Sequence, residues 1–135
     1  MELRMSEIHA IQTELEQINE KITSVQSISF MVDLAGQLAA WLAFSGEQMA
    51  IAKKKWRAAK VRAYDNYAFS KAASGLKITP SVATDYAQAR SGDEESDYEH
   101  CERVNKAITH TLDVLRTCIS ALKAEQFAFQ YSGNQ

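Results

Sequence analysis

The sequence contains few residues that end helices and strands. Its 135 residues include one proline and five glycines. Turn-forming residues are therefore too scarce for a β fold with many turns, and they favour a few long elements. Good helix formers dominate the rest of the chain: alanine, glutamate, lysine, glutamine and leucine. We expect an all-α fold, an elongated antiparallel helical hairpin or bundle, in a single domain over residues 1–135.

Long apolar runs are also absent. The most apolar stretch, FMVDLAGQLAAWLAF, carries Asp33 and Gln37 and is shorter than the roughly 18 residues typical of a membrane span. The N-terminal MELRMSEI has no basic segment followed by an apolar one, as a secretory signal would. We therefore expect no membrane partner and a cytoplasmic location.

Cysteine is scarce as well. The two cysteines, Cys101 and Cys118, are 17 positions apart in what the pattern predicts to be one helix. At about 1.5 Å per residue they are separated by roughly 25 Å, beyond the reach of a disulfide. We expect two packed thiols in a reducing compartment.

Near the N-terminus, apolar residues recur with alternating spacings of three and four. A narrow seam of this period predicts a coiled-coil helix over residues 6–27. The seam residues are Ile8, Ile11, Leu15, Ile18, Ile22 and Val25. This pattern is consistent with packing against the same chain or against a second copy, and we expect a homo-oligomer.

Three further segments follow from the pattern. A long basic helix is predicted over 30–74, and a connector over 76–92 contains a short helix that starts at Pro80. The last helix is predicted over 93–130, with Ser91 and Glu94 forming a capping box. Its apolar face fades near Gln130, and the tail FQYSGNQ is expected to fray.

Charge is unevenly distributed along this nearly neutral chain. Residues 31–78 hold eight bases and three acids, net +5, whereas residues 79–105 hold two bases and seven acids, net −5. If the hairpin turns near residue 83, position i lies opposite position 167 − i. The acids at 93–102 would then lie opposite 65–74. Lys53 to Lys60 would lie opposite 107–114, a stretch with one acid, Asp113, so the basic run would be largely without acidic neighbours.

The basic run therefore predicts a binding surface for something negative. Its candidate residues are Lys53, Lys54, Lys55, Arg57, Lys60, Arg62 and Tyr64. Several cations on one helix are suited to nucleic-acid phosphates, to acidic helices of another protein or subunit, or simply to solvent. Trp56 and Tyr67 lie on the apolar stripe and are expected to pack in the core, which leaves Tyr64 as the more exposed aromatic ring.

Sequence motifs for catalysis are missing. There is no GxxxxGK[ST], GxGxxG, CxxC or HExxH, and Asp97-x-x-His100 is half of a helical metal motif without a second half. His100 itself is expected to be a solvated histidine beside acids. We expect no enzyme activity, no cofactor, no metal and no small-molecule substrate.

Parts of the chain resemble small all-helical proteins of tailed bacteriophages and prophages. The resemblance covers about residues 34–126 and rests on three stretches: WRAAKVRAY (56–64), the Ala87-x-Ala89-Arg90 segment and LDVLRTCISALKAE (112–125). It implies a non-enzymatic accessory protein in the host cytoplasm, associated with early genes near recombination and replication. It brings no catalytic residues, and it does not include the isoleucine seam.

Overall fold

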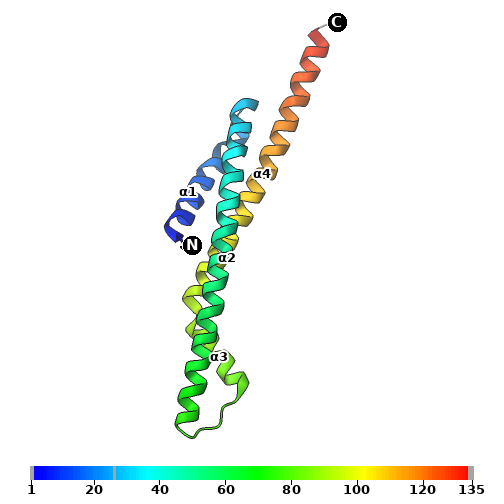
Figure 1. Cartoon of the computed structure of the whole chain (residues 1–135). Helices are drawn as coiled ribbons and strands as arrows, with labels where there is room; N and C mark the ends of the chain where they lie inside the picture. Colours follow the sequence, from blue (N-terminus) through cyan, green and yellow to red (C-terminus); the bar gives the residue numbers. More distant parts are fainter. Residues whose placement is uncertain (1, 26, 134–135) are drawn as a thin grey trace.

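The structure is a computed structural model that describes residues 2–25 and 27–133. The described residues form four α-helices and one short 3-10 turn (Figure 1). These are α1 (Met5–Lys21), the turn η1 (Ile22–Ser24), α2 (Ile28–Ala73), α3 (Pro80–Arg90) and α4 (Gly92–Gly133). The all-α prediction is confirmed: α2 packs antiparallel against α4 in an elongated hairpin that widens into a bundle at one end.

The long helix α2 has local signals at both of its ends. The Ser27 side chain accepts a hydrogen bond from the backbone N–H of Phe30, which satisfies one of the free donors of the first turn. At the other end Gly75 adopts a φ of +73°, a conformation that favours glycine, and the helix stops. Between these ends α2 is continuous through Gly36 and Gly46.

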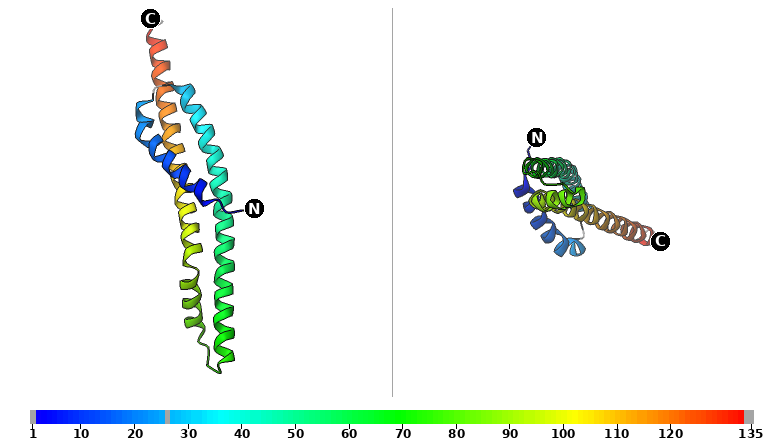
Figure 2. Two further views of the ribbon diagram at one scale, coloured as in Figure 1. Left: turned by 90° about the vertical axis from the view of Figure 1, so that its left-hand side faces the viewer. Right: turned by 90° about the horizontal axis from the view of Figure 1, so that it is seen from below.

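Ser91 joins α3 to α4, but it does not form the predicted capping box. Its hydroxyl is buried and donates to the carbonyl oxygens of Ala87 and Gln88, so its side chain is committed to the end of α3. The α3 helix itself begins as predicted, with Thr79 before it and Pro80 in its first turn. Together α3 and α4 form the return arm beside α2 (Figure 2).

The predicted hairpin register is wrong. The chain reverses between Ser74 and Thr79 rather than near residue 83, because α3 already belongs to the return arm and packs on α2. Trp56, predicted to lie opposite position 111, instead stacks on Tyr98, which is 13 positions earlier. Ser45 and Asn105 agree with this register to within about one helical turn at the bundle end, where the asparagine amide donates to the serine hydroxyl at 2.9 Å.

The N-terminal helix α1 folds back on its own chain, against α2 and α4 (Figure 2). Its His9 ring lies 4.4 Å from that of His100, and Asn19 accepts a hydrogen bond from Thr111 at 3.0 Å. Because residue numbers increase in the same direction along α1 (9 to 19) and α4 (100 to 111), α1 runs parallel to α4 and antiparallel to α2. Three helices thus share a core at one end of the molecule, and the other end is the α2–α3–α4 hairpin.

The predicted helix over 6–27 is shorter in the structure. It ends at Lys21, η1 follows, and Val25 is extended, while position 26 lies outside the described residues. The chain must turn there to enter α2, and Ser24 supports the turn by donating to the Lys21 carbonyl oxygen at 2.7 Å. Only the first part of the seam is therefore α-helical.

Residues 129–133 of the segment predicted to fray are helical in the structure, and residues 134–135 lie outside the described residues. α4 continues to Gly133, and every side chain from Lys123 to Gly133 is exposed. We call residues 123–133 the α4 tail. Figure 1 shows it extending past the bundle with no helix beside it.

Candidate interaction surfaces

Helical periodicity distributes the basic run around α2. At about 100° per residue, Lys53 and Lys60 lie about 20° apart, whereas Lys55 lies about 160° from Lys53. Lys53 is close to Tyr98, with its ammonium nitrogen 5.9 Å from the ring centroid. Arg62, on the other flank, lines a shallow depression with Glu94. The six cations therefore do not form one face of the helix.

The acidic start of α4 lies beside this run, against the sequence-based expectation. Lys53 lowers the pKa of Glu102, although Lys106 has the larger effect on that carboxyl, which it contacts at 2.7 Å. Glu102 in turn raises the pKa of Tyr98, and Arg57 opposes this shift. Lys53 and Arg57 on α2 thus form an electrostatic cluster with Tyr98, Glu102 and Lys106 on α4.

Four of the six cations are exposed. Lys54 and Lys55 are exposed, as are Arg57 and Arg62, while Lys53 and Lys60 are half-buried. Ion pairs among residues 2–25 and 27–133 join Arg4 to Glu7, Lys106 to Glu102, and Arg116 to Asp113, without any base of the run. The exposed cations are therefore available to a polyanion, although over a narrower surface than the sequence predicts.

The aromatic rings of the run serve mainly as packing. Trp56 stacks on Tyr98, and Tyr67 lies 4.7 Å from Tyr86, as expected for residues on the apolar stripe. Tyr64 is half-buried like these two, so the structure does not single it out as the exposed ring.

The isoleucine seam is used within the chain. Its residues Ile8, Ile11, Leu15 and Ile22 are buried in the core formed with α2 and α4, whereas Ile18 and Val25 are only half-buried. The buried residues are therefore not free to bind a second copy. The buried part of the seam therefore does not support self-association. Only Ile18 and Val25 remain partly accessible to a second copy.

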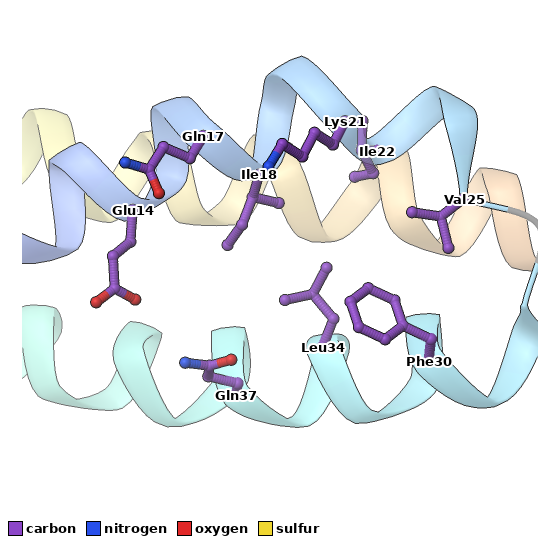
Figure 3. A pocket seen from close by; sticks show the side chains of 9 residues that line it. All are labelled: Glu14, Gln17, Ile18, Lys21, Ile22, Val25, Phe30, Leu34 and Gln37. Atoms are coloured by element: carbon purple, nitrogen blue, oxygen red, sulfur yellow. The ribbon is translucent and has the colours of Figure 1, made fainter.

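Ile18 and Val25 line a groove between α1 and α2, at the three-helix end of the molecule. We call it the α1/α2 groove. It has a volume of about 400 Å³, and its walls are Glu14, Gln17, Ile18, Lys21, Ile22, Val25, Phe30, Leu34 and Gln37. Figure 3 shows that Ile18 and Val25 point across the gap toward Leu34 and Phe30. The groove is apolar at its centre, and its charged residues are Glu14 and Lys21.

The second apolar surface is the α4 tail, which sequence reasoning missed. Phe127, Phe129 and Tyr131 are 71%, 79% and 65% exposed. Such large exposed aromatics in one segment mark an interaction site more often than isolated ones do. The available signal was the spacing of Leu122, Gln126 and Phe129, which continues the apolar stripe of α4 beyond Ile119.

His100 and Cys101 do not have the surroundings of a catalytic pair or a metal site. His100 is half-buried rather than solvated, and its Nε2 is buried without a hydrogen-bond partner in the described part of the chain. Burial raises the pKa of the Cys101 thiol to about 11. Among the described residues, no three His, Cys, Asp or Glu side chains gather as a metal site would require.

The α2 helix qualifies, by length and composition only, as a possible membrane span. A window of its 46 residues has a mean hydropathy of 1.4, and 17% of that window is buried in the structure. The sequence-based rejection of a span considered a shorter stretch. Core helices of soluble proteins and signal sequences satisfy the same criterion, so this feature alone assigns no membrane role.

Comparison of the chain with protein-family models, with curated proteins and with solved structures gives no match. The resemblance to phage helical proteins therefore stays a prediction.

Proposed function

We propose that this chain is a protein-interaction module that binds amphipathic helices at the end of its bundle. The observation that carries this proposal is the α4 tail, which continues past the bundle and presents three exposed aromatic rings. The exposed aromatic side chains of this helix can be buried by the apolar face of a partner helix. Burial of one apolar helix face against another apolar surface is a common mode of peptide recognition. The expected phage accessory role is compatible with such a module.

A photo-crosslinking experiment tests the proposal. A benzophenone amino acid is placed at position 129 in one variant and at position 69 in another. Phe129 and Phe69 are 79% and 80% exposed, so the two probes are matched in accessibility. Irradiation in bacterial cytoplasm is expected to give a discrete protein adduct from position 129 and none from 69. Equal labelling at both positions, or no adduct at 129, would overturn the proposal.

A second candidate function is contact with nucleic acid through the exposed cations of α2. It is favoured by the exposure of Lys54, Lys55 and Arg57, which have no ion-pair partner within the described residues. A site of this size contacts about three phosphates, so log Kobs against log salt is expected to have a slope of about −3.

The test is a salt titration of binding to single- and double-stranded DNA. Lys54→Glu/Lys55→Glu/Arg57→Glu is expected to abolish binding, whereas the control Lys123→Glu, on the α4 tail, leaves it unchanged. Absence of binding at 50 mM salt, a condition that favours phosphate contacts, would remove this candidate.

A further inference from the structure

Two arginines from different helices border one shallow depression in the hairpin half of the molecule. Arg62 on α2 and Arg90 on α3 both line it, and its other polar side chains are those of Asn66 and Glu94. Its volume is about 400 Å³. We call it the Arg62/Arg90 depression. It lies at the opposite end of the molecule from the α4 tail, because α3 packs beside the far half of α2 (Figure 1).

Small side chains on α2 leave room for the depression where α3 packs on this helix. Ala59 and Ala63 line it from α2, and Ala59 is only 9% exposed, so it lies at the bottom. Tyr86 lines it from α3. The buried hydroxyl of Ser91 donates to two carbonyl oxygens in the last turn of α3. These bonds fix the end of α3, and with it the backbone of the neighbouring Arg90.

The guanidinium group of Arg90 is held against an aromatic ring. Its central carbon lies 5.2 Å from the centroid of the Tyr86 ring, and this ring lies 4.7 Å from that of Tyr67 on α2. A guanidinium group that already stacks on a ring loses less conformational freedom when it binds a ligand. Arg90 is therefore oriented at the edge of the depression before any ligand arrives.

The depression carries an excess of positive charge. Arg62 and Arg90 supply two charges, and the half-buried Glu94 supplies one of opposite sign. Neither arginine belongs to an ion pair among residues 2–25 and 27–133, although Glu94 lines the same depression. Both arginines are exposed, so their N–H donors are accessible to a ligand from solvent.

Two guanidinium groups around one depression are better suited to a phosphate than to a carboxylate. Each group offers a fork of parallel N–H donors, and the two oxygens of a carboxylate fill one such fork. A terminal phosphate has three free oxygens that are not in one plane, so it can accept from two forks, and it carries about −1.5 to −2 charges at pH 7. We propose that the Arg62/Arg90 depression binds a terminal phosphate group between its two arginines. The proposal depends neither on the α4 tail nor on the lysines of α2.

Isothermal titration calorimetry of the purified full chain tests the proposal. The probes are inorganic phosphate and a nucleoside 5′-monophosphate, and dissociation constants of about 1 mM or below are expected. Arg62→Gln and Arg90→Gln are each expected to weaken binding about tenfold or more. The control Arg116→Gln changes an exposed arginine of α4 outside the depression and is expected to leave binding unchanged. Circular dichroism verifies that each variant remains helical. Absence of binding, or binding insensitive to both arginines, would overturn the proposal.

Two further variants separate a built site from diffuse attraction between charges. Arg90→Lys keeps the positive charge but loses the fork of donors, and it is expected to weaken binding about tenfold. Glu94→Gln removes a negative charge from the depression and is expected to strengthen binding about threefold. If Arg90→Lys binds both probes as tightly as wild type does, only the charge matters and the proposed site is wrong.

Three more titrations identify the source of the phosphate. The probes are an oligothymidine strand with a 5′-phosphate, the same strand without it, and an oligoglutamate peptide. Tighter binding of the phosphorylated strand than of the monophosphate, lost in Arg62→Gln, supports the proposal and assigns the site to nucleic-acid ends. Equal or weaker binding of that strand supports it and assigns the site to small phosphate esters. Binding of oligoglutamate but of no phosphate probe would show that the arginines bind carboxylates, and it would overturn the proposal.

The outcome is distinguishable from that of the nucleic-acid candidate. Lys54, Lys55 and Arg57, which carry that candidate, do not line the depression. A chain that binds no unphosphorylated strand but binds inorganic phosphate through Arg62 and Arg90 therefore removes the nucleic-acid candidate and retains this site.

Discussion

The indole of Trp56 on α2 stacks on the ring of Tyr98 on α4, with centroids 5.7 Å apart and planes 24° from parallel. The indole N–H is buried, and it has no hydrogen-bond partner within the described residues. We expect Trp56→Ala to lower the free energy of unfolding by about 2 kcal/mol, less than for a fully buried tryptophan, because the ring is half-buried. Trp56→Phe keeps a ring and removes the unpaired donor, so its cost is expected to be under about 1 kcal/mol.

Urea denaturation measures both effects. The control Phe69→Ala removes a ring that is 80% exposed and is expected to change the free energy of unfolding by less than about 0.5 kcal/mol. Equal effects of Trp56→Ala and Phe69→Ala would contradict the stacked arrangement and, with it, the register of the hairpin.

That register shows where the sequence was informative. Helix periodicity and the Pro80 and Ser74-Gly75 signals locate the elements, because these signals act within one or two turns of the chain. The pairing of α2 with α4 depends instead on where the return arm starts. The sequence pattern places α3 in the connector, whereas in the structure α3 belongs to the return arm. This difference shifts the residues predicted to lie opposite the basic run, so the prediction misses the acids of α4 beside it.

The two interaction surfaces at the bundle end illustrate the same limit. Whether Ile8 and Leu15 are covered by α2 and α4 or by a second copy depends on how the chain turns between α1 and α2, and the seam pattern is identical in both cases. The α4 tail carries aromatic residues in sequence, yet its exposure follows only from the length of the return arm, α3 and α4 together, relative to α2. Periodicity identifies an apolar face but does not identify what covers it.

His100 is expected to make the free energy of unfolding depend on pH. Burial lowers the pKa of this imidazole, and the positive charges of His9 on α1 and Arg103 lower it further, while Asp97 opposes them. The folded chain therefore binds fewer protons than the unfolded one below about pH 6.5. The free energy of unfolding is expected to fall as pH decreases through 6.5 and to stop falling from this cause below the folded pKa.

The measurement compares variants, because carboxyl groups also titrate in acid. The free energy of unfolding is determined between pH 7.5 and 5.5 for wild type, His100→Gln and His110→Gln. His100→Gln is expected to have a smaller loss over this range, whereas His110→Gln, a change at an exposed position on α4, behaves like wild type. Identical pH profiles for wild type and His100→Gln would refute the role of His100.

The two cysteines are expected to react at very different rates. Cys101 is buried, its sulfur lies 3.6 Å from that of Met5, and burial raises its pKa to about 11. At pH 8 about 0.1% of this thiol is ionised, and the thiolate is the reactive form. Cys118 is half-buried and lies nearer the open end of the bundle.

Alkylation with iodoacetamide followed by mass spectrometry of the peptides tests this expectation. One thiol per folded chain, that of Cys118, is expected to be modified quickly, and Cys101 only when the chain opens. Cys118→Ser should therefore remove the fast phase. Fast modification of Cys101 in that variant would show that α1 does not cover α4 in solution.

Two glycines are expected to respond in opposite directions to the same substitution. Gly36 lies in the interior of α2, is exposed, and has no atom within 4 Å of an added Cβ. Gly36→Ala therefore gains helix propensity without a clash, and the free energy of unfolding is expected to rise by about 0.8 kcal/mol. Gly75 also has open space around it, but its φ of +73° is unfavourable for alanine, so Gly75→Ala is expected to destabilise by about 1 kcal/mol. Thermal unfolding of both variants beside wild type measures the difference, and a stabilising Gly75→Ala would contradict the turn that ends α2.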